Sequence, residues 1–155
     1  MIFKELKKFI QFLKNVKKRP QQTFDLGLIV KESQSKVNKE KIWDEIKKVV
    51  SIERLIYDEF SSEEDVIGKI IDAFKNGKWV WLEIKKDIGS LLLNQLKNLT
   101  NNNFLQLIDY QGKDIFEIKM PQNSRLIIFA EKDFIENKIS YPHFYRLFGP
   151  TLRIK

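Results

Sequence analysis

Side chains that usually hold metals or act as nucleophiles are scarce in this sequence of 155 residues. There is no cysteine, which excludes disulfides, thiolate catalysis, iron–sulfur clusters and cysteine-type zinc sites. The single histidine, His143, has no second histidine with which to share a metal, so we interpret it as a structural residue. The acidic run at 63–65 follows Ser61 and Ser62 in a capping-box pattern and suits a helix start better than a metal site. We therefore expect neither a metal nor a cofactor.

Positive charge is concentrated at the N-terminus. The chain carries a formal net charge of +7, and residues 1–19 contain one acidic side chain, Glu5, so the remaining chain is nearly neutral. The basic side chains of this segment are Lys4, Lys7, Lys8, Lys14, Lys17, Lys18 and Arg19. A segment of this kind can follow the phosphates of a nucleic acid or lie on an anionic membrane, and both partners stay open here.

Apolar residues of the same segment recur at helical spacing from Ile2 to Val16, with lysines between them. This pattern predicts a basic amphipathic helix within 1–19 that ends before Pro20. We expect its apolar stripe to dock on residues 20–155 and its lysines to face solvent, which makes the chain a single domain.

Short apolar runs alternate with helical stripes along the rest of the chain. This alternation predicts an α/β fold in which a five-stranded, mainly parallel sheet lies between two layers of helices. The strands are expected at about 25–30, 52–58, 79–84, 125–130 and 151–154. Two further runs, 104–110 and 114–120, flank a Gly-containing turn and predict an inserted β-hairpin.

The sequence contains no run that predicts a membrane span. No apolar stretch approaches the roughly 18 residues that a spanning helix needs. The N-terminus is too rich in lysine for a signal peptide. We therefore expect a cytoplasmic protein.

Three stretches, taken in order, resemble the AAA+ ATPases, in particular the branch that includes dynein motor modules, midasin and MoxR-type proteins. They are residues 61–68 (SSEEDVIG), residues 76–83 (NGKWVWLE) followed by 93–96 (LNQL), and residues 111–128 with the segment PQNSRLII. The second resembles a Walker B strand and its following helix, and the third resembles the strand that carries sensor 1. The resemblance covers about residues 20–155. It implies a three-layer αβα P-loop NTPase-like core with its five strands in the order 5-1-4-3-2.

The residues that would bind phosphate depart from this family. The resemblance places the phosphate loop at residues 31–38, where lysine occupies both glycine positions. Side chains at those positions obstruct the tight turn that wraps phosphate. The polar residues left in this degenerate loop are Ser33, Ser35, Lys36 and Asn38. Alternatively, the segment is an ordinary polar loop in which Ser33 or Ser35 caps the next helix.

The catalytic positions implied by the resemblance are also altered. Glu83 takes the place of the metal-binding acid of Walker B, and Ile84 takes the place of the glutamate that polarises water. Arg146 stands at the position of the arginine finger, and we expect no helical lid after it. The structural alternatives are a Glu83 carboxylate paired with a nearby lysine and an Arg146 side chain in a salt bridge.

These residues predict a catalytically degenerate AAA+-like domain that acts as a non-enzymatic protein-binding or scaffolding module. We expect a protein partner, no cofactor, and a monomer or weak dimer. Two alternatives stay open. One is an ATP-binding and ATP-hydrolysing AAA+ ATPase with unusual motifs, and the other is binding of nucleic acid or an anionic membrane through residues 1–19.

Overall fold

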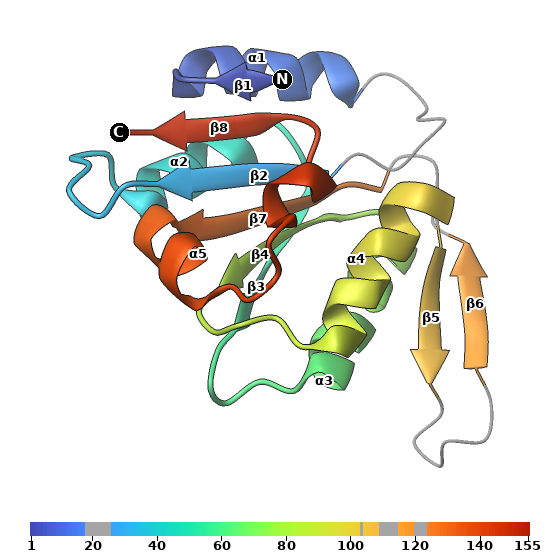
Figure 1. Ribbon diagram of the computed structural model, residues 1–155. Helices are drawn as coiled ribbons and strands as arrows, with labels where there is room; N and C mark the ends of the chain where they lie inside the picture. The colour runs from blue at the N-terminus through green and yellow to red at the C-terminus, as the bar shows by residue number, and fades with distance from the viewer. Residues whose placement is uncertain (18–25, 103, 109–114, 120–123) are drawn as a thin grey trace.

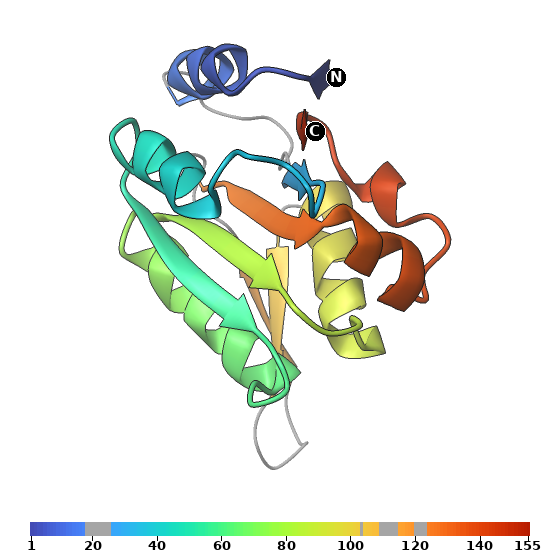
Figure 2. The same ribbon diagram turned by 90° about the vertical axis from the view of Figure 1, so that its left-hand side faces the viewer.

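A six-stranded parallel sheet lies between two layers of helices (Figures 1 and 2). The computed structural model describes residues 1–17, 26–102, 104–108, 115–119 and 124–155. In spatial order the strands are β1 (Ile2–Phe3), β8 (Thr151–Ile154), β2 (Leu26–Lys31), β7 (Leu126–Glu131), β4 (Trp79–Ile84) and β3 (Ile52–Tyr57). All neighbouring strands are parallel. The predicted α/β class is therefore confirmed.

The five expected strands follow the expected order, β8-β2-β7-β4-β3. The predicted number of strands is wrong, because Ile2–Phe3 forms a sixth strand at the edge of the sheet. It pairs with the start of β8, where the Thr151 amide donates to the Met1 carbonyl at 2.9 Å. Ile2 and Phe3 fit the spacing of the helical stripe equally well, so the sequence did not separate this strand from the helix that follows.

A two-stranded antiparallel sheet stands beside the main one (Figure 1). It consists of β5 (Phe104–Ile108) and β6 (Ile115–Lys119), so the predicted hairpin is confirmed over these strands. The turn expected between them lies outside the described residues.

The helices divide between the two faces of the sheet (Figure 2). On one face lie α1 (Leu6–Val16) and α2 (Lys39–Lys47). The other face carries α3 (Glu63–Lys75), α4 (Ser90–Asn102), α5 (Lys132–Lys138) and the short 3₁₀ helix η1 (Phe144–Leu147). The predicted cap of α3 is present, since the Ser62 side chain accepts a hydrogen bond from the Asp65 amide at 3.1 Å. No helix in the described part of the chain is long and apolar enough to cross a membrane.

Helix α1 is part of the folded body. Its side chains Phe9, Ile10 and Leu13 are buried in the same apolar cluster as Ile42 and Ile46 of α2. The exposed side of α1 carries the lysines, as expected. Of the predicted basic segment, Lys18 and Arg19 lie outside the described residues.

Candidate functional site

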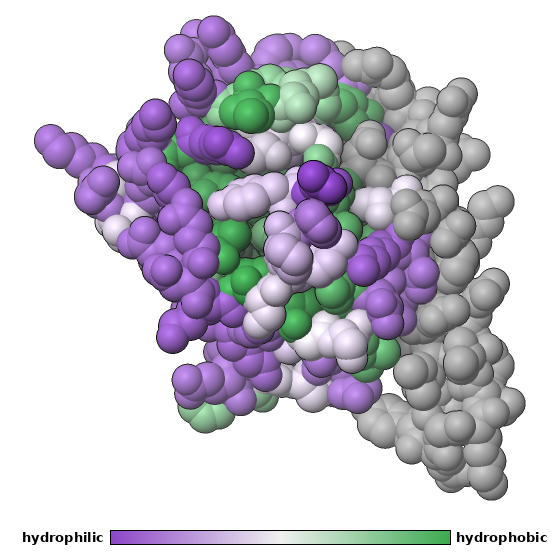
Figure 3. Space-filling view, viewed as in Figure 1, coloured by the Kyte–Doolittle hydropathy of each residue, from purple (hydrophilic) through white to green (hydrophobic). Residues whose placement is uncertain are grey.

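The carboxyl ends of β2, β7 and β4 meet at one edge of the sheet. Ligands of open parallel sheets bind in the crevice at this edge. The surface there, at the left of Figure 3, is mostly hydrophilic. It contains a cavity of about 260 Å³. The residues that line this edge cavity are Lys39, Glu83, Ile84, Lys85, Phe129, Ala130, Glu131 and Phe134.

Glu83 is the buried acidic group of the edge cavity, with only 2% of its surface exposed. Its place in β4 sets it between Ile56 of β3 and Phe129 of β7. A carboxylate in such surroundings is costly unless opposite charges compensate it. The predicted pairing with lysine is therefore physically required, and the structure confirms it.

Three cations surround the Glu83 carboxylate. Lys39 Nζ lies 3.0 Å from Oε1, Arg54 Nη2 lies 3.5 Å from Oε1, and Lys85 Nζ lies 3.4 Å from Oε2. These cations come from the start of α2, from β3 and from the residue that follows β4. The charge that could attract a metal ion is therefore already balanced by the protein's own side chains.

Arg54 also joins β3 to the first turn of α2. Its guanidinium makes two hydrogen bonds to the Glu40 carboxylate, at 2.7 and 2.8 Å. These bonds hold the pKa of Glu40 below its usual value. The guanidinium carbon lies 5.5 Å from the ring centre of Trp43 and 5.8 Å from that of Trp81, within the range of cation–π attraction.

Aromatic rings of the sheet and of α2 pack together beside this charge cluster. Trp81 stacks on Phe129 with ring centres 5.1 Å apart, and Trp43 meets Trp81 edge-on at 5.6 Å. Trp81 is fully buried. The rings leave Arg54 little room to reorient, so the position of its guanidinium is set by packing as well as by charge.

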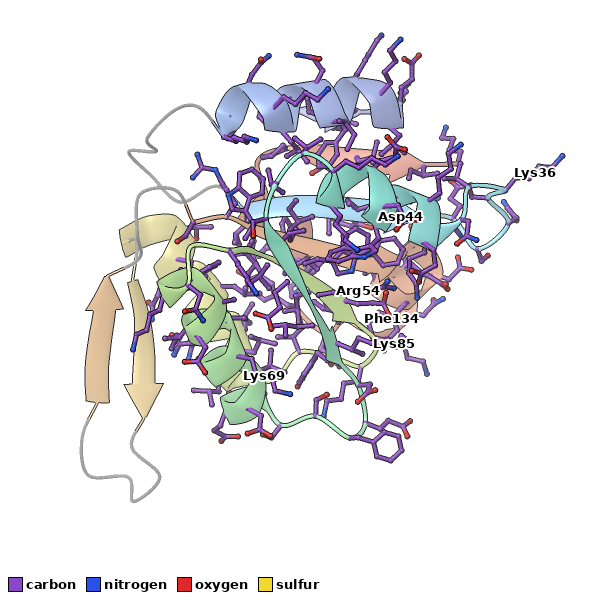
Figure 4. All side chains as sticks on the ribbon, turned by 180° about the vertical axis from the view of Figure 1, so that it is seen from behind. Lys36, Asp44, Arg54, Lys69, Lys85 and Phe134 are labelled. Carbon is purple, nitrogen blue, oxygen red and sulfur yellow. The ribbon has the colours of Figure 1, made fainter. Side chains whose placement is uncertain are left out.

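The polar loop before α2 does not contribute its predicted residues to the edge cavity. The Ser33 hydroxyl donates to Asp133 Oδ2 in α5 at 3.1 Å, and the Ser35 hydroxyl accepts from the Val37 amide at 3.2 Å. Lys36 is exposed and points away from the body at the tip of the loop (Figure 4). None of these three side chains lines the cavity.

Asn38 has a local structural role. Its side-chain oxygen accepts from the Glu40 amide at 2.8 Å and so caps α2. The prediction that Ser33 or Ser35 would cap this helix is wrong, because both hydroxyls are engaged elsewhere. The cap occupies an amide that an anion would otherwise bind at a helix N-terminus.

Lys39 is, with Arg54 and Lys85, a residue of the site that the sequence prediction missed. It is the first residue of α2 and lines the edge cavity beside Glu83, whereas the prediction ended the loop at Asn38. An N-cap pattern was the available signal, because Asn38 followed by Lys-Glu-Lys marks a helix that starts at Lys39.

Arg146 lies away from the edge cavity. It is exposed in η1, on the face of the sheet opposite α1 and α2. Within the part of the chain that the structure describes it makes no ion pair, so the predicted salt bridge is not found there. His143, just before it, meets the ring of Tyr141 edge-on at 6.0 Å. No group of three potential metal ligands occurs among the described residues.

Neither a protein-family model nor a curated protein sequence matches this chain. The AAA+ resemblance therefore rests on its residues and on the order of its strands.

The Arg54–Glu40 bridge predicts a pH-dependent contribution to stability. The folded-state pKa of Glu40 is lowered from 4.5, so the bridge stabilises fully above that value and less as pH falls through the folded-state pKa. In urea unfolding, Glu40→Gln should lower the midpoint at pH 7 and have a smaller effect at pH 3. In an Arg54→Gln background, Glu40→Gln should lose this pH dependence. An equal loss at both pH values would show that the carboxylate charge is irrelevant.

Proposed function

We propose that this chain is a catalytically degenerate AAA+-like domain that works as a non-enzymatic protein-binding or scaffolding module. The AAA+ assignment is supported by the strand order β8-β2-β7-β4-β3 and by the hairpin placed between β4 and β7 in the chain. Both agree with what the sequence resemblance implies.

The three ion pairs of Glu83 carry the non-enzymatic part of the proposal. An acid that serves a magnesium ion offers it oxygens, whereas Glu83 Oε1 faces Lys39 and Arg54, and Oε2, which accepts no hydrogen bond from the described residues, lies 3.4 Å from Lys85 Nζ. The following position is Ile84, whose side chain cannot polarise water. Phosphoryl transfer depends on positioned charge around the phosphates. The ion pairs of Glu83 instead join β4 to β3 and to α2.

Protein binding is favoured by apolar side chains at the free edge of the sheet. Ile56, near the end of the edge strand β3, is 44% exposed, and Phe60, in the loop that follows β3, is 96% exposed. The loop is held in shape, since the Phe60 amide donates to Asp58 Oδ1 at 2.9 Å and the Ser61 hydroxyl donates to the Ile56 carbonyl at 3.0 Å. An ordered, exposed aromatic residue is a suitable anchor for a partner's pocket.

The nucleotide-binding alternative has one observation in its favour, namely that Lys39 reaches the edge cavity from the first turn of α2. A thermal-shift titration with ATP, ADP and GTP, with and without magnesium, separates the two functions. We expect no magnesium-dependent shift and no phosphate release above background. A magnesium-dependent shift that disappears in Lys39→Ala would establish nucleotide binding in the cavity and overturn the non-enzymatic proposal.

The protein-binding part can be tested by photocrosslinking in the source cells. A photoreactive phenylalanine analogue at position 60 should give a discrete adduct that mass spectrometry identifies. The same analogue at position 75, exposed on α3, is the matched control. Identical adduct patterns at both positions would show that Phe60 does not mark a specific interface.

A further inference from the structure

The exposed side of α1 is a row of lysines fixed in place by the packing of its other side. Lys4, Lys7, Lys8, Lys14 and Lys17 are all exposed. The opposite side of the helix buries Phe9, Ile10 and Leu13. Lys17 Nζ donates to the Val49 carbonyl at 2.7 Å, which ties the end of α1 to the segment after α2. Figure 4 shows nitrogen-tipped side chains rising from α1 away from the body.

Most of this positive charge is free to meet a ligand. Lys8 lies 3.8 Å from the exposed carboxylate of Glu5. Among the residues that the structure describes, Lys4, Lys7 and Lys14 form no ion pair. The packed helix α2 and its C-cap add three more exposed lysines, Lys41, Lys47 and Lys48, and Lys48 Nζ lies 3.1 Å from the Glu45 carboxylate. We call these exposed lysines of α1 and α2, with Lys4 and Lys17 at the ends of α1, the lysine face.

The buried stripe argues against a membrane as the ligand. A helix that lies on a bilayer inserts its apolar side among the lipids, and charge alone gives a weaker attachment. Here that side is the core of the domain, with Phe9 fully buried and Leu13 at 3% exposure. Membrane insertion would require α1 to leave the sheet and expose this cluster to water.

The composition of the lysine face argues against a protein partner as well. Protein interfaces concentrate aromatic residues, methionine and arginine at their centres, and lysine is depleted there. Between the lysines on α1 lie Gln11 and Asn15, both polar and exposed. Between its lysines, α1 therefore offers polar groups, and the exposed apolar side chains Met1 and Ile2 lie before the helix, at the start of β1.

We infer that the lysine face binds the phosphate backbone of a nucleic acid. Helix α1 has 11 residues and is about 16 Å long, so its lysines span several consecutive phosphates of a duplex. Contacts from lysine to phosphate carry no sequence information, and we expect binding without base preference. This binding is independent of the proposed protein contact at Phe60, which lies in the loop after the opposite edge strand of the sheet.

The test is fluorescence anisotropy with a labelled 20-base-pair duplex of mixed sequence, at salt concentrations from 50 to 200 mM. If three lysines contact phosphate, affinity should fall about 40-fold over this range. The triple variant Lys7→Gln, Lys8→Gln, Lys14→Gln should reduce the slope of log K against log salt by about 2.7. These side chains are exposed, so circular dichroism and the melting temperature should remain unchanged.

The matched control removes the same charge from the other face. Lys69→Gln, Lys75→Gln, Lys78→Gln changes three exposed lysines on or beside α3, far from α1; Lys69 is marked in Figure 4. We expect this variant to bind the duplex like the wild type. An equal loss in both variants would show that net charge alone attracts DNA, and the lysine face would be refuted.

Two further results would overturn the inference. One is the absence of duplex binding at 50 mM salt with tens of micromolar protein. The other is tighter binding to phosphatidylserine–phosphatidylcholine vesicles than to the duplex, since this would assign α1 to an anionic membrane. Duplex binding that persists in a Phe60→Ala variant would support the inference whether or not the protein-binding proposal holds.

Discussion

Replacing Phe9 with alanine should lower the free energy of unfolding by about 3–5 kcal/mol. The ring is fully buried between α1 and the sheet and meets Phe3 edge-on with centres 5.6 Å apart. Removing it deletes apolar contacts and leaves a cavity that a helix tied at both ends cannot easily close. Urea unfolding followed by tryptophan fluorescence measures the change.

A second substitution on the same helix serves as the control. Lys14→Ala removes an exposed side chain and should change the free energy of unfolding by no more than about 0.5 kcal/mol. A loss below about 1 kcal/mol in Phe9→Ala would mean that α1 is undocked in solution. Its apolar stripe would then be free to enter a membrane, and the preference for nucleic acid would be lost.

The central strands were predictable because their sequence admits few other structures. The run from Trp79 to Ile84 is buried at every position, and its predicted bounds agree with β4. Such runs suit a parallel sheet covered on both faces. The two-residue strand β1 gave no comparable signal, since its pairing depends on β8, about 150 residues away in the chain.

The candidate site was only partly predictable. The position of Glu83 at the end of a strand was readable from the sequence, and its need for a lysine partner followed from burial. The identity of that partner was not readable, because Lys39 and Arg54 meet Glu83 only through the order of the strands. Arg146 shows the opposite case, in which a family position was recognised but the described residues place it away from the cavity.

Replacing Glu83 should change the free energy of unfolding in opposite directions for a structural and for a functional role. Residues kept for catalysis often cost stability, so their replacement tends to stabilise the protein. A residue kept to balance buried charge does the reverse, because its loss leaves cations without a partner. For Glu83 those cations are Lys39 and Lys85, whereas Arg54 would keep its bridge to Glu40.

Glu83→Gln should therefore lower the free energy of unfolding, by about 2–3 kcal/mol at pH 7. Removing one partner of a fully buried ion pair lowers the free energy of unfolding by about 3–5 kcal/mol. The side chains of Lys39, Arg54 and Lys85 are 30%, 21% and 51% exposed, and water reduces the cost.

Glu131→Gln is the matched control, since it neutralises an exposed carboxylate at the same cavity and should change little. Lys39→Met should relieve part of the loss caused by Glu83→Gln, with a coupling of about 1 kcal/mol or more in a double-mutant cycle. If Glu83→Gln stabilises the protein, the carboxylate is held under functional strain. The edge cavity would then have to be treated as a working nucleotide site.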